Sequence, residues 1–291
     1  MRRLQRRLLL AASCLALALP AGAQDDADYA YDDPEVAAPA PSAGNLLRSS
    51  NLVDSPTATV LGHGRYRIEC RLMDGGSLVA GTSVGIKDRL EVGVSWGMQG
   101  LLGRGEVEFN DRTALSLRLL LVEEMELPAL VIGFDNQGYG RWYETLPVGP
   151  GGAERELERY ERKSKGFFLA ATRNWYGPLG TDVATTGGLN YSGEDTDESS
   201  LDFFAGLEQD FDGRFALVVD YAAGLDDRKD ESPRRFGSGR GWLDLGLRWN
   251  VVDQVQFKFF FRDLLSNYRR PVDGGRDSVD RQLEISYEGS F

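Results

Sequence analysis

The last nine residues constrain the fold more than any other part of this chain. Apolar and polar residues alternate through them, so that one face of an extended strand carries Leu283, Ile285, Tyr287 and Phe291. The opposite face carries Glu and Ser residues. A strand that stays apolar up to a final aromatic residue is typical of the last strand of a bacterial outer-membrane β-barrel, where it closes the cylinder. We therefore predict that these four residues form the signal read by the barrel assembly machinery.

The first 23 residues have the pattern of a cleaved secretory signal. Four arginines within the first seven residues precede an apolar run from Leu8 to Leu19, and Ala21-Gly22-Ala23 supplies small residues for cleavage. The run is too short to span a bilayer. Residues 24–44 are acidic, rich in Ala and Pro and without periodicity, which predicts a disordered leader. The predicted barrel domain then covers residues 45–291.

Composition excludes several function classes. Removal of the signal lowers the number of basic side chains from 33 to 29, against 45 acidic ones, which gives a formal charge of −16. Nucleic acid is therefore not expected as a partner, because phosphate binding needs clustered Lys and Arg. No window after residue 23 approaches 18 consecutive apolar residues, so no helical span is predicted. A closed barrel is the remaining way for such an exported chain to enter a membrane.

Period-two alternation continues along the whole predicted domain, between turns rich in Gly, Asp, Asn and Pro. Twelve stretches show it, at 66–72, 78–86, 90–97, 115–121, 130–134, 167–171, 183–191, 201–207, 215–221, 243–249, 255–262 and 283–291. Short connections such as 87–89 alternate with long polar ones such as 138–164. Aromatic residues recur near strand ends, as an interfacial girdle requires: Tyr66, Trp96, Trp175, Tyr191, Tyr221, Trp242 and Trp249.

These patterns predict an all-β fold, an antiparallel up-and-down transmembrane β-barrel of about 12 strands in the outer membrane of a Gram-negative bacterium. Fourteen strands remain the alternative, because Gly103–Asn110 fits an extra strand, an inward-folded loop or an extension of its neighbours. The mixed-charge segment 153–165 is expected to be a solvent-facing loop with room for a helical turn.

The polar face of the strands defines a predicted lumen. Its charged residues carry both signs: Arg67, Glu69, Arg71, Glu91, Arg118, Asp135, Asp244, Arg248, Lys258 and Arg262. Twelve strands leave a narrow lumen, so we expect opposed charges to pair and plug the barrel. On this assignment Leu245→Arg, on the lipid face, should impair assembly by roughly 2–4 kcal/mol, and Arg248→Leu, on the lumen face, should be much milder.

No residue pattern points to catalysis. His63 is the only histidine and precedes the first predicted strand, at the expected periplasmic rim. Neither a dense zinc-ligand pattern nor a phosphate-binding glycine loop is present, so no catalytic residue, cofactor or metal is predicted. A barrel lipase or protease is the least favoured function. Arg234-Arg235 and Arg269-Arg270 fall in outer loops, where we expect contacts with lipopolysaccharide phosphates besides the outer-membrane lipid.

Three short motifs resemble those of YjbH-like outer-membrane proteins. They are Asn51–Ala58 (NLVDSPTA), Gly133–Gly140 (GFDNQGYG) and Lys163–Phe167 (KSKGF), within a resemblance that covers roughly residues 45–291. The family is associated with exopolysaccharide production or export. The resemblance therefore implies a non-enzymatic envelope protein with exopolysaccharide as a partner, and it supplies no catalytic residues. The alternative is a narrow channel for small solutes.

Overall fold

The computed structural model describes residues 49–102, 107–148, 153–176, 181–195, 200–227, 236–269 and 279–291. The predicted signal and leader lie outside these ranges. The barrel strands are β1 (Arg65–Met73), β2 (Ser77–Ile86), β3 (Leu90–Gln99), β4 (Glu108–Val122), β5 (Ala129–Asp135), β8 (Gly166–Tyr176), β9 (Asp182–Tyr191), β10 (Leu201–Asp210), β11 (Phe215–Ala222), β12 (Trp242–Val252), β13 (Val255–Arg262) and β14 (Asp280–Ser290). The 3₁₀ turns η1 (Asp74–Gly76) and η4 (Leu225–Asp227) lie in connections between strands.

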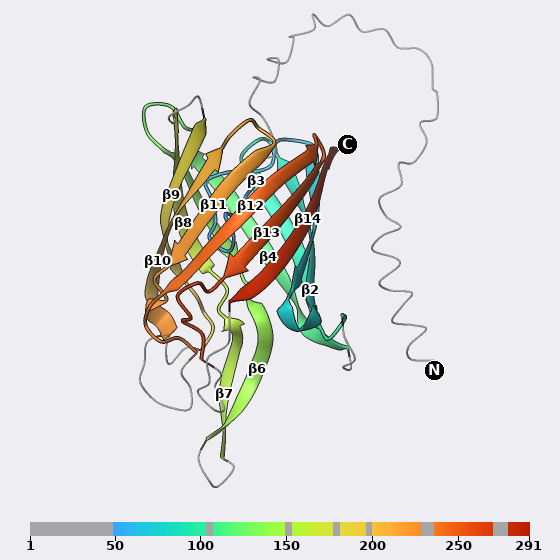
Figure 1. Ribbon diagram of the computed structural model, residues 1–291, viewed down its shortest axis with the longest axis vertical. Helices are drawn as coiled ribbons and strands as arrows, with labels where there is room; N and C mark the ends of the chain where they lie inside the picture. The colour runs from blue at the N-terminus through green and yellow to red at the C-terminus, as the bar shows by residue number, and fades with distance from the viewer. Residues whose placement is uncertain are drawn as a thin grey trace, which may run out of the picture. The chain divides into compact units, whose positions relative to one another are not determined.

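Within the described ranges these twelve strands form a closed antiparallel barrel (Figure 1). Each of the twelve predicted alternating stretches forms one of its strands, which confirms the fold prediction. Closure joins β1 to β14 in a register that runs from Arg65 opposite Ser290 to Met73 opposite Gln282. The alternating C-terminal segment is therefore the closing strand. Its role as an assembly signal stays a prediction.

A separate hairpin lies between β5 and β8. β6 (Tyr139–Val148) pairs with β7 (Ala153–Arg162), and the pair projects beyond the end of the barrel opposite the C-terminus (Figure 1). The expectation of a loop with a helical turn at 153–165 was therefore wrong. β7 pairs with β6 along its length, and two residues among its charged ones, Leu157 and Tyr160, are buried. Of the ambiguous segment 103–110, residues 108–110 extend β4, and residues 103–106 lie outside the described ranges.

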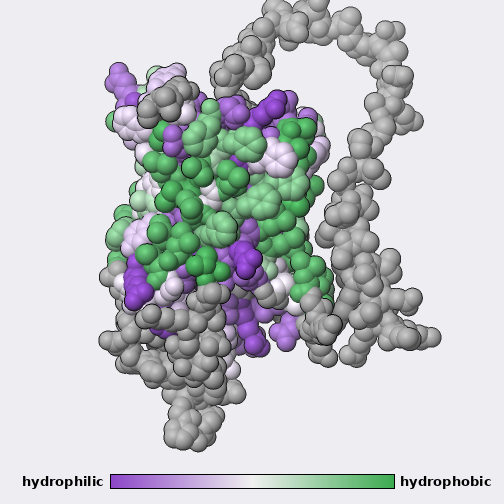
Figure 2. Space-filling model, viewed as in Figure 1, coloured by the Kyte–Doolittle hydropathy of each residue, from purple (hydrophilic) through white to green (hydrophobic). Residues whose placement is uncertain are grey.

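The outer wall of the barrel is apolar. Leu115 is 53 % exposed, Phe259 45 % and Leu247 39 %. Figure 2 shows hydrophobic residues gathered across the visible wall of the barrel. A closed barrel satisfies its backbone hydrogen bonds internally, which allows such a surface to face lipid. None of the helical segments in the described ranges has the length and hydrophobicity of a membrane-spanning helix.

Trp242, predicted to lie in the interfacial girdle, faces the lumen instead. Trp242 is 5 % exposed and packs inside the barrel with Phe168 and Phe204. It shares its strand parity with the buried Asp244, so the alternation of β12 itself assigns it to the lumen. The expectation that Trp242 belongs to the interfacial girdle was wrong, because nearness to a strand end was given more weight than strand parity.

Candidate functional site

Residues 49–61 fill the lumen, and we call them the plug hairpin. They run directly into β1, so the hairpin enters from the rim that holds the C-terminus, which is the expected periplasmic rim. Thr57 N donates to Ser50 O at 2.9 Å and Leu52 N donates to Ser55 O at 2.9 Å, while a β-bridge joins the two arms. All residues from 52 to 58 are buried. The hairpin therefore occupies the interior as part of the protein core.

The tip of the plug hairpin is held by one carboxylate of the wall. Asp220 on β11 accepts hydrogen bonds at Oδ2 from the backbone N–H groups of Val53, Asp54 and Ser55, at 3.1, 2.9 and 2.9 Å. Three successive amides that point at one anion form a nest-like site. Because the acceptor is charged and buried, each of these bonds contributes about 1.5–3 kcal/mol.

The side chain of Asp54 ties the tip to the outer part of the molecule. Its Oδ2 pairs with the Arg262 guanidinium of β13 and, at 2.9 Å, with Nη1 of Arg162 of β7. Nη2 of Arg162 lies 2.8 Å from Oδ2 of Asp244 on β12. The plug hairpin, the barrel wall and the outer hairpin therefore share one network of buried charges.

The arms of the plug hairpin are bonded nearer the rim that holds the C-terminus. Ser50 Oγ donates to Glu91 and accepts from Arg67 Nη1 at 2.6 Å, and the Arg118 guanidinium donates to the Ser50 carbonyl. On the returning arm, Leu61 N donates to Glu91 Oε2 at 2.9 Å. These wall residues were predicted to face the lumen, and each of them bonds to the plug hairpin.

Apolar contacts and glycines complete the fit. Leu52 and Val53 pack with Val218 of β11 and Phe260 of β13 in one buried cluster. Gly206 of β10 leaves room for this cluster, since a Cβ built there would lie 2.3 Å from Cδ1 of Leu52. The wall therefore fits the plug hairpin through the space that Gly206 leaves as well as through its charges.

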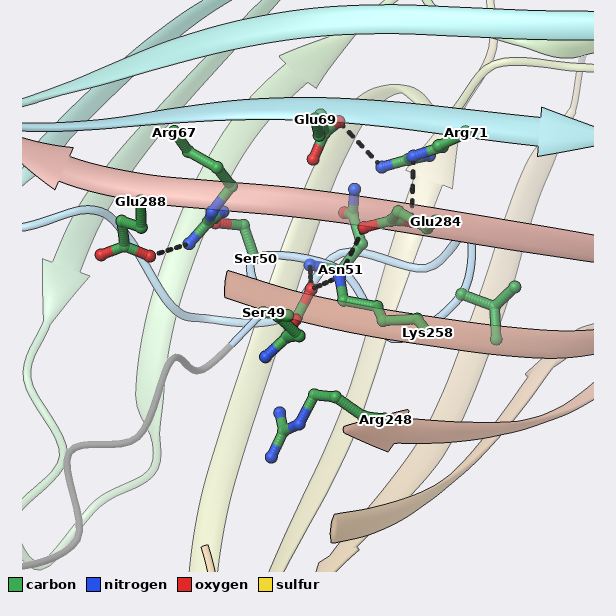
Figure 3. Close-up of polar contacts among 12 residues, drawn as sticks. Ser49, Ser50, Asn51, Arg67, Glu69, Arg71, Arg248, Lys258, Glu284 and Glu288 are labelled. Carbon is green, nitrogen blue, oxygen red and sulfur yellow. Dashed lines mark hydrogen bonds and ion pairs between the residues drawn. The ribbon is translucent and has the colours of Figure 1, made fainter. Parts of the chain in front are cut away.

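The remaining lumen charges pair mainly along the wall (Figure 3). Lys258 Nζ lies 2.6 Å from Glu284 Oε1 and donates to Ser49 Oγ, while Arg71 Nε lies 3.2 Å from Glu284 Oε2. Lys258 and Arg71 each stand opposite Glu284 in the strand register. Pairs between neighbouring strands lie flat against the wall and do not cross the lumen. The expectation that paired charges themselves plug the barrel therefore needs correction, because the plug is a segment of chain.

The other charged residues that were predicted to face the lumen bond to neighbouring groups of the wall. Arg248 of β12 pairs with Glu208 at 2.7 Å and with Asp210 at 3.2 Å. Glu69 pairs with Arg71 on its own strand, and Asp135 accepts from the backbone N–H of Gln137.

In the closing strand, Leu283 and Ile285 alternate with the buried Gln282, Glu284 and Ser286, and Phe291 stacks on Tyr66. His63 is exposed and accepts at Nδ1 from Lys87 N, beside a short turn.

Two outer connections clasp the base of the β6–β7 hairpin over the lumen. Arg159 Nη1 lies 2.6 Å from Asp227 Oδ1, and Lys163 Nζ donates to the carbonyl of Asp226 at 3.1 Å. Glu194, after β9, accepts from two backbone N–H groups of this base. Burial raises the pKa of Asp226 to about 7, and the neighbouring Asp227 adds to the increase while Lys163 opposes it. Burial also raises the pKa of Glu194.

Little space remains inside. A cavity of about 50 Å³ lies beside the arms of the plug hairpin, between Ser50 and Gln137 among others, which is room for water only. A larger cavity of about 350 Å³ lies at the outer mouth and is lined by Tyr139, Arg162, Trp242 and Arg262, among others. Within the described ranges no group of three or more His, Cys, Asp or Glu side chains is placed to hold a metal ion.

The three motifs that resemble YjbH-like proteins meet at this site. Asn51–Ala58 belongs to the plug hairpin. Gln137 and Tyr139 of the second motif line the two cavities, and Lys163 of the third lies with Asp54 around a small buried space. Sequence reasoning did not identify the plug hairpin, Asp220 or Arg162 as parts of the site. The available signals were the turn-forming Asp54-Ser55-Pro56 and the inward parity of Asp220.

Comparison with known proteins gives similarity of fold. No family model matches the chain, and no curated protein sequence matches it. Among solved structures, the KdgM porin is similar with a TM-score of 0.43 and 8 % identity, over 78 % of this chain and 99 % of the porin. The NanC porin gives a TM-score of 0.40 and 7 % identity over 78 % and 99 % of the two chains. The Acinetobacter baumannii outer membrane protein Omp33 gives a TM-score of 0.41 and 5 % identity, over 78 % of this chain and 97 % of Omp33. At these identities the similarity is one of barrel architecture.

Proposed function

We propose that the protein is a narrow outer-membrane channel for small solutes whose lumen is closed by the plug hairpin. One observation carries this proposal: the obstruction is a separate chain segment, with both arms at the periplasmic rim, held at its tip by hydrogen bonds to Asp220 and by ion pairs of Asp54. The wall charges pair along the wall, so departure of the segment would leave a passage lined by charged residues and, in part, by the apolar cluster of Phe168, Phe204 and Trp242. A non-catalytic role agrees with the position of His63 outside the lumen.

The test removes the tip without disturbing the arms. Thr57 N donates to Ser50 O, so excision of residues 51–56 and their replacement by a Gly-Gly turn should keep this hydrogen bond and both ends of the hairpin. In planar bilayers, we expect the intact protein to be closed and the excised variant to give steady single-channel conductance. Asp220→Ala, which removes the acceptor for three tip amides, should give intermittent openings.

A second candidate is a permanently closed barrel with a structural role in the envelope. The apolar packing of Leu52 and Val53 on Val218 and Phe260 favours it, because such contacts belong to a stable core. A folded excised variant that stays silent in bilayers would support this candidate and contradict the channel.

We also propose membership of the YjbH-like family, supported by the three motifs that gather around the plug hairpin. An exopolysaccharide role depends on this resemblance. Unchanged exopolysaccharide output in a deletion strain would contradict it.

A further inference from the structure

We propose that Arg162 and Arg262 form a binding site for the carboxylate of a small solute that enters from outside the cell, and that Asp54 of the plug hairpin occupies this site in the closed barrel. Asp54 thus acts as a built-in competitor of the solute. The consequence that binding opens the channel rests on the proposed function, whereas binding itself does not.

The first support is the convergence of two cations on one carboxylate. Arg162 and Arg262 come from different parts of the fold, β7 and β13, and both reach Oδ2 of Asp54. Oδ1 of Asp54 and Nε of Arg262 are buried, and neither has a hydrogen-bond partner among the described residues. Arginine and carboxylate pair best through two parallel hydrogen bonds. A free carboxylate can adopt that geometry, while the tethered Asp54 leaves an acceptor and a donor unused.

The second support is access. Both arginines line the cavity of about 350 Å³ at the outer mouth. The Arg162 guanidinium lies 4.7 Å from the ring centroid of Trp242, and that of Arg262 lies 4.8 Å from the ring centroid of Tyr139. Stacking on aromatic rings orients the guanidinium groups before a ligand arrives. The cavity therefore combines aromatic rings with two oriented cations.

The other charges of the cavity restrict the class of ligand. Asp74, Glu161, Asp263 and Asp280 also line it, with Arg281 as a further cation. Glu161 accepts from the Tyr143 and Tyr268 hydroxyls, and Asp263 accepts from two backbone amides, so both already have donors. Four acidic groups oppose a ligand of several negative charges. The cavity thus selects a small solute with a single carboxylate.

Competition with Asp54 makes binding and release of the plug hairpin one equilibrium. The solute binds only the state in which Asp54 has left the two arginines, so it raises the population of that state. At a free concentration about ten times its dissociation constant, a solute of this kind raises that population about tenfold.

The experiment measures exposure of the tip in liposomes, in the protein without residues 1–23, so that Cys14 is absent. Ser55 is fully buried, so Ser55→Cys in a Cys70→Ser background should react slowly with a maleimide in sodium chloride. In sodium acetate of equal ionic strength, we expect the reaction to be about tenfold faster. Equal rates in the two salts would overturn the proposal. Sodium citrate should accelerate the reaction less than acetate, and an equal or larger effect would overturn the single-carboxylate class.

Variants distinguish binding of acetate at the two arginines from a general destabilisation of the plug hairpin. Asp54→Asn should react quickly in chloride and gain nothing from acetate, and Arg262→Gln should lose the response to acetate. Glu208→Gln removes another carboxylate from the lumen, one that pairs with Arg248 away from the tip, and should keep the full response. An unchanged acetate response in Asp54→Asn would also contradict the proposal.

The labelling and the conductance can fail separately. Acetate-dependent labelling in a barrel whose excised variant is silent would contradict the channel and keep the binding site. A conducting excised variant with acetate-independent labelling would contradict the binding site and keep the channel.

Discussion

The two faces of the barrel wall are built by different rules. The outer face is a repeat of exposed apolar side chains, such as Leu245 and Leu247. The lumen face is a set of individual contacts, in which Asp220, Glu91 and Arg118 bind particular donor and acceptor atoms of the plug hairpin. A surface that contacts lipid needs only to be apolar, whereas a surface that contacts a protein plug needs matched hydrogen-bond donors, acceptors and space. Alternation in the sequence therefore identifies the lumen side of a strand but does not reveal what fills the lumen.

The largest expected effect is on the outer face. Leu245→Arg places a charge against lipid and should destabilise the folded barrel by roughly 2–4 kcal/mol, if the residue lies near the bilayer midplane. Urea unfolding in liposomes measures this change. Glu69→Gln is a matched lumen control, since Glu69 is less buried than its partner Arg71. A loss for Glu69→Gln as large as that for Leu245→Arg would break the distinction between the two faces.

A smaller loss is expected for Arg248→Leu in the lumen. From the alternation alone this change should be much milder than Leu245→Arg, but Arg248 is buried and pairs with both Glu208 and Asp210. Its removal leaves two partly buried carboxylates without their cation, which should cost about 1–3 kcal/mol. Arg248→Lys keeps the charge and should lose less. A neutral result for Arg248→Leu in the same unfolding assay would show that these wall pairs contribute nothing to stability.

The most local expected effect concerns the outer clasp and pH. Because the pKa of Asp226 is raised to about 7, the closed clasp binds more protons than an opened one between the ordinary value near 3.8 and about pH 7. The free energy of opening should therefore fall as pH rises through this window and level off above it. Amide hydrogen exchange of residues 159–164, corrected for intrinsic rates, measures the opening. Asp226→Asn should flatten the pH dependence, and an opening free energy that rises with pH would contradict the assignment.

Much of the wall could be predicted from the sequence, because the pleat of a strand and its burial share one period. The stretch 243–249 shows this, with leucines outward and Asp244 and Arg248 inward. The plug hairpin could not be predicted in this way. Asn51–Ala58 has no repeat, and its position depends on contacts with residues more than 160 positions away, such as Asp220. The β6–β7 hairpin was missed for a related reason, since the contacts of the charged β7 are with β6, Phe236, Asp227 and Glu194, and they leave no repeat in the sequence.

The most direct test of the account asks whether the tip of the plug hairpin lies inside the barrel. Val53 and Val218 share one buried cluster, whereas the adjacent Leu217 is 40 % exposed on the outer face. In a Cys70→Ser background in native membranes, the pair Val53→Cys and Val218→Cys should form a disulfide under mild oxidation, and the pair Val53→Cys and Leu217→Cys should not. A folded barrel that forms neither disulfide, or forms both equally, would contradict a lumen closed by the plug hairpin.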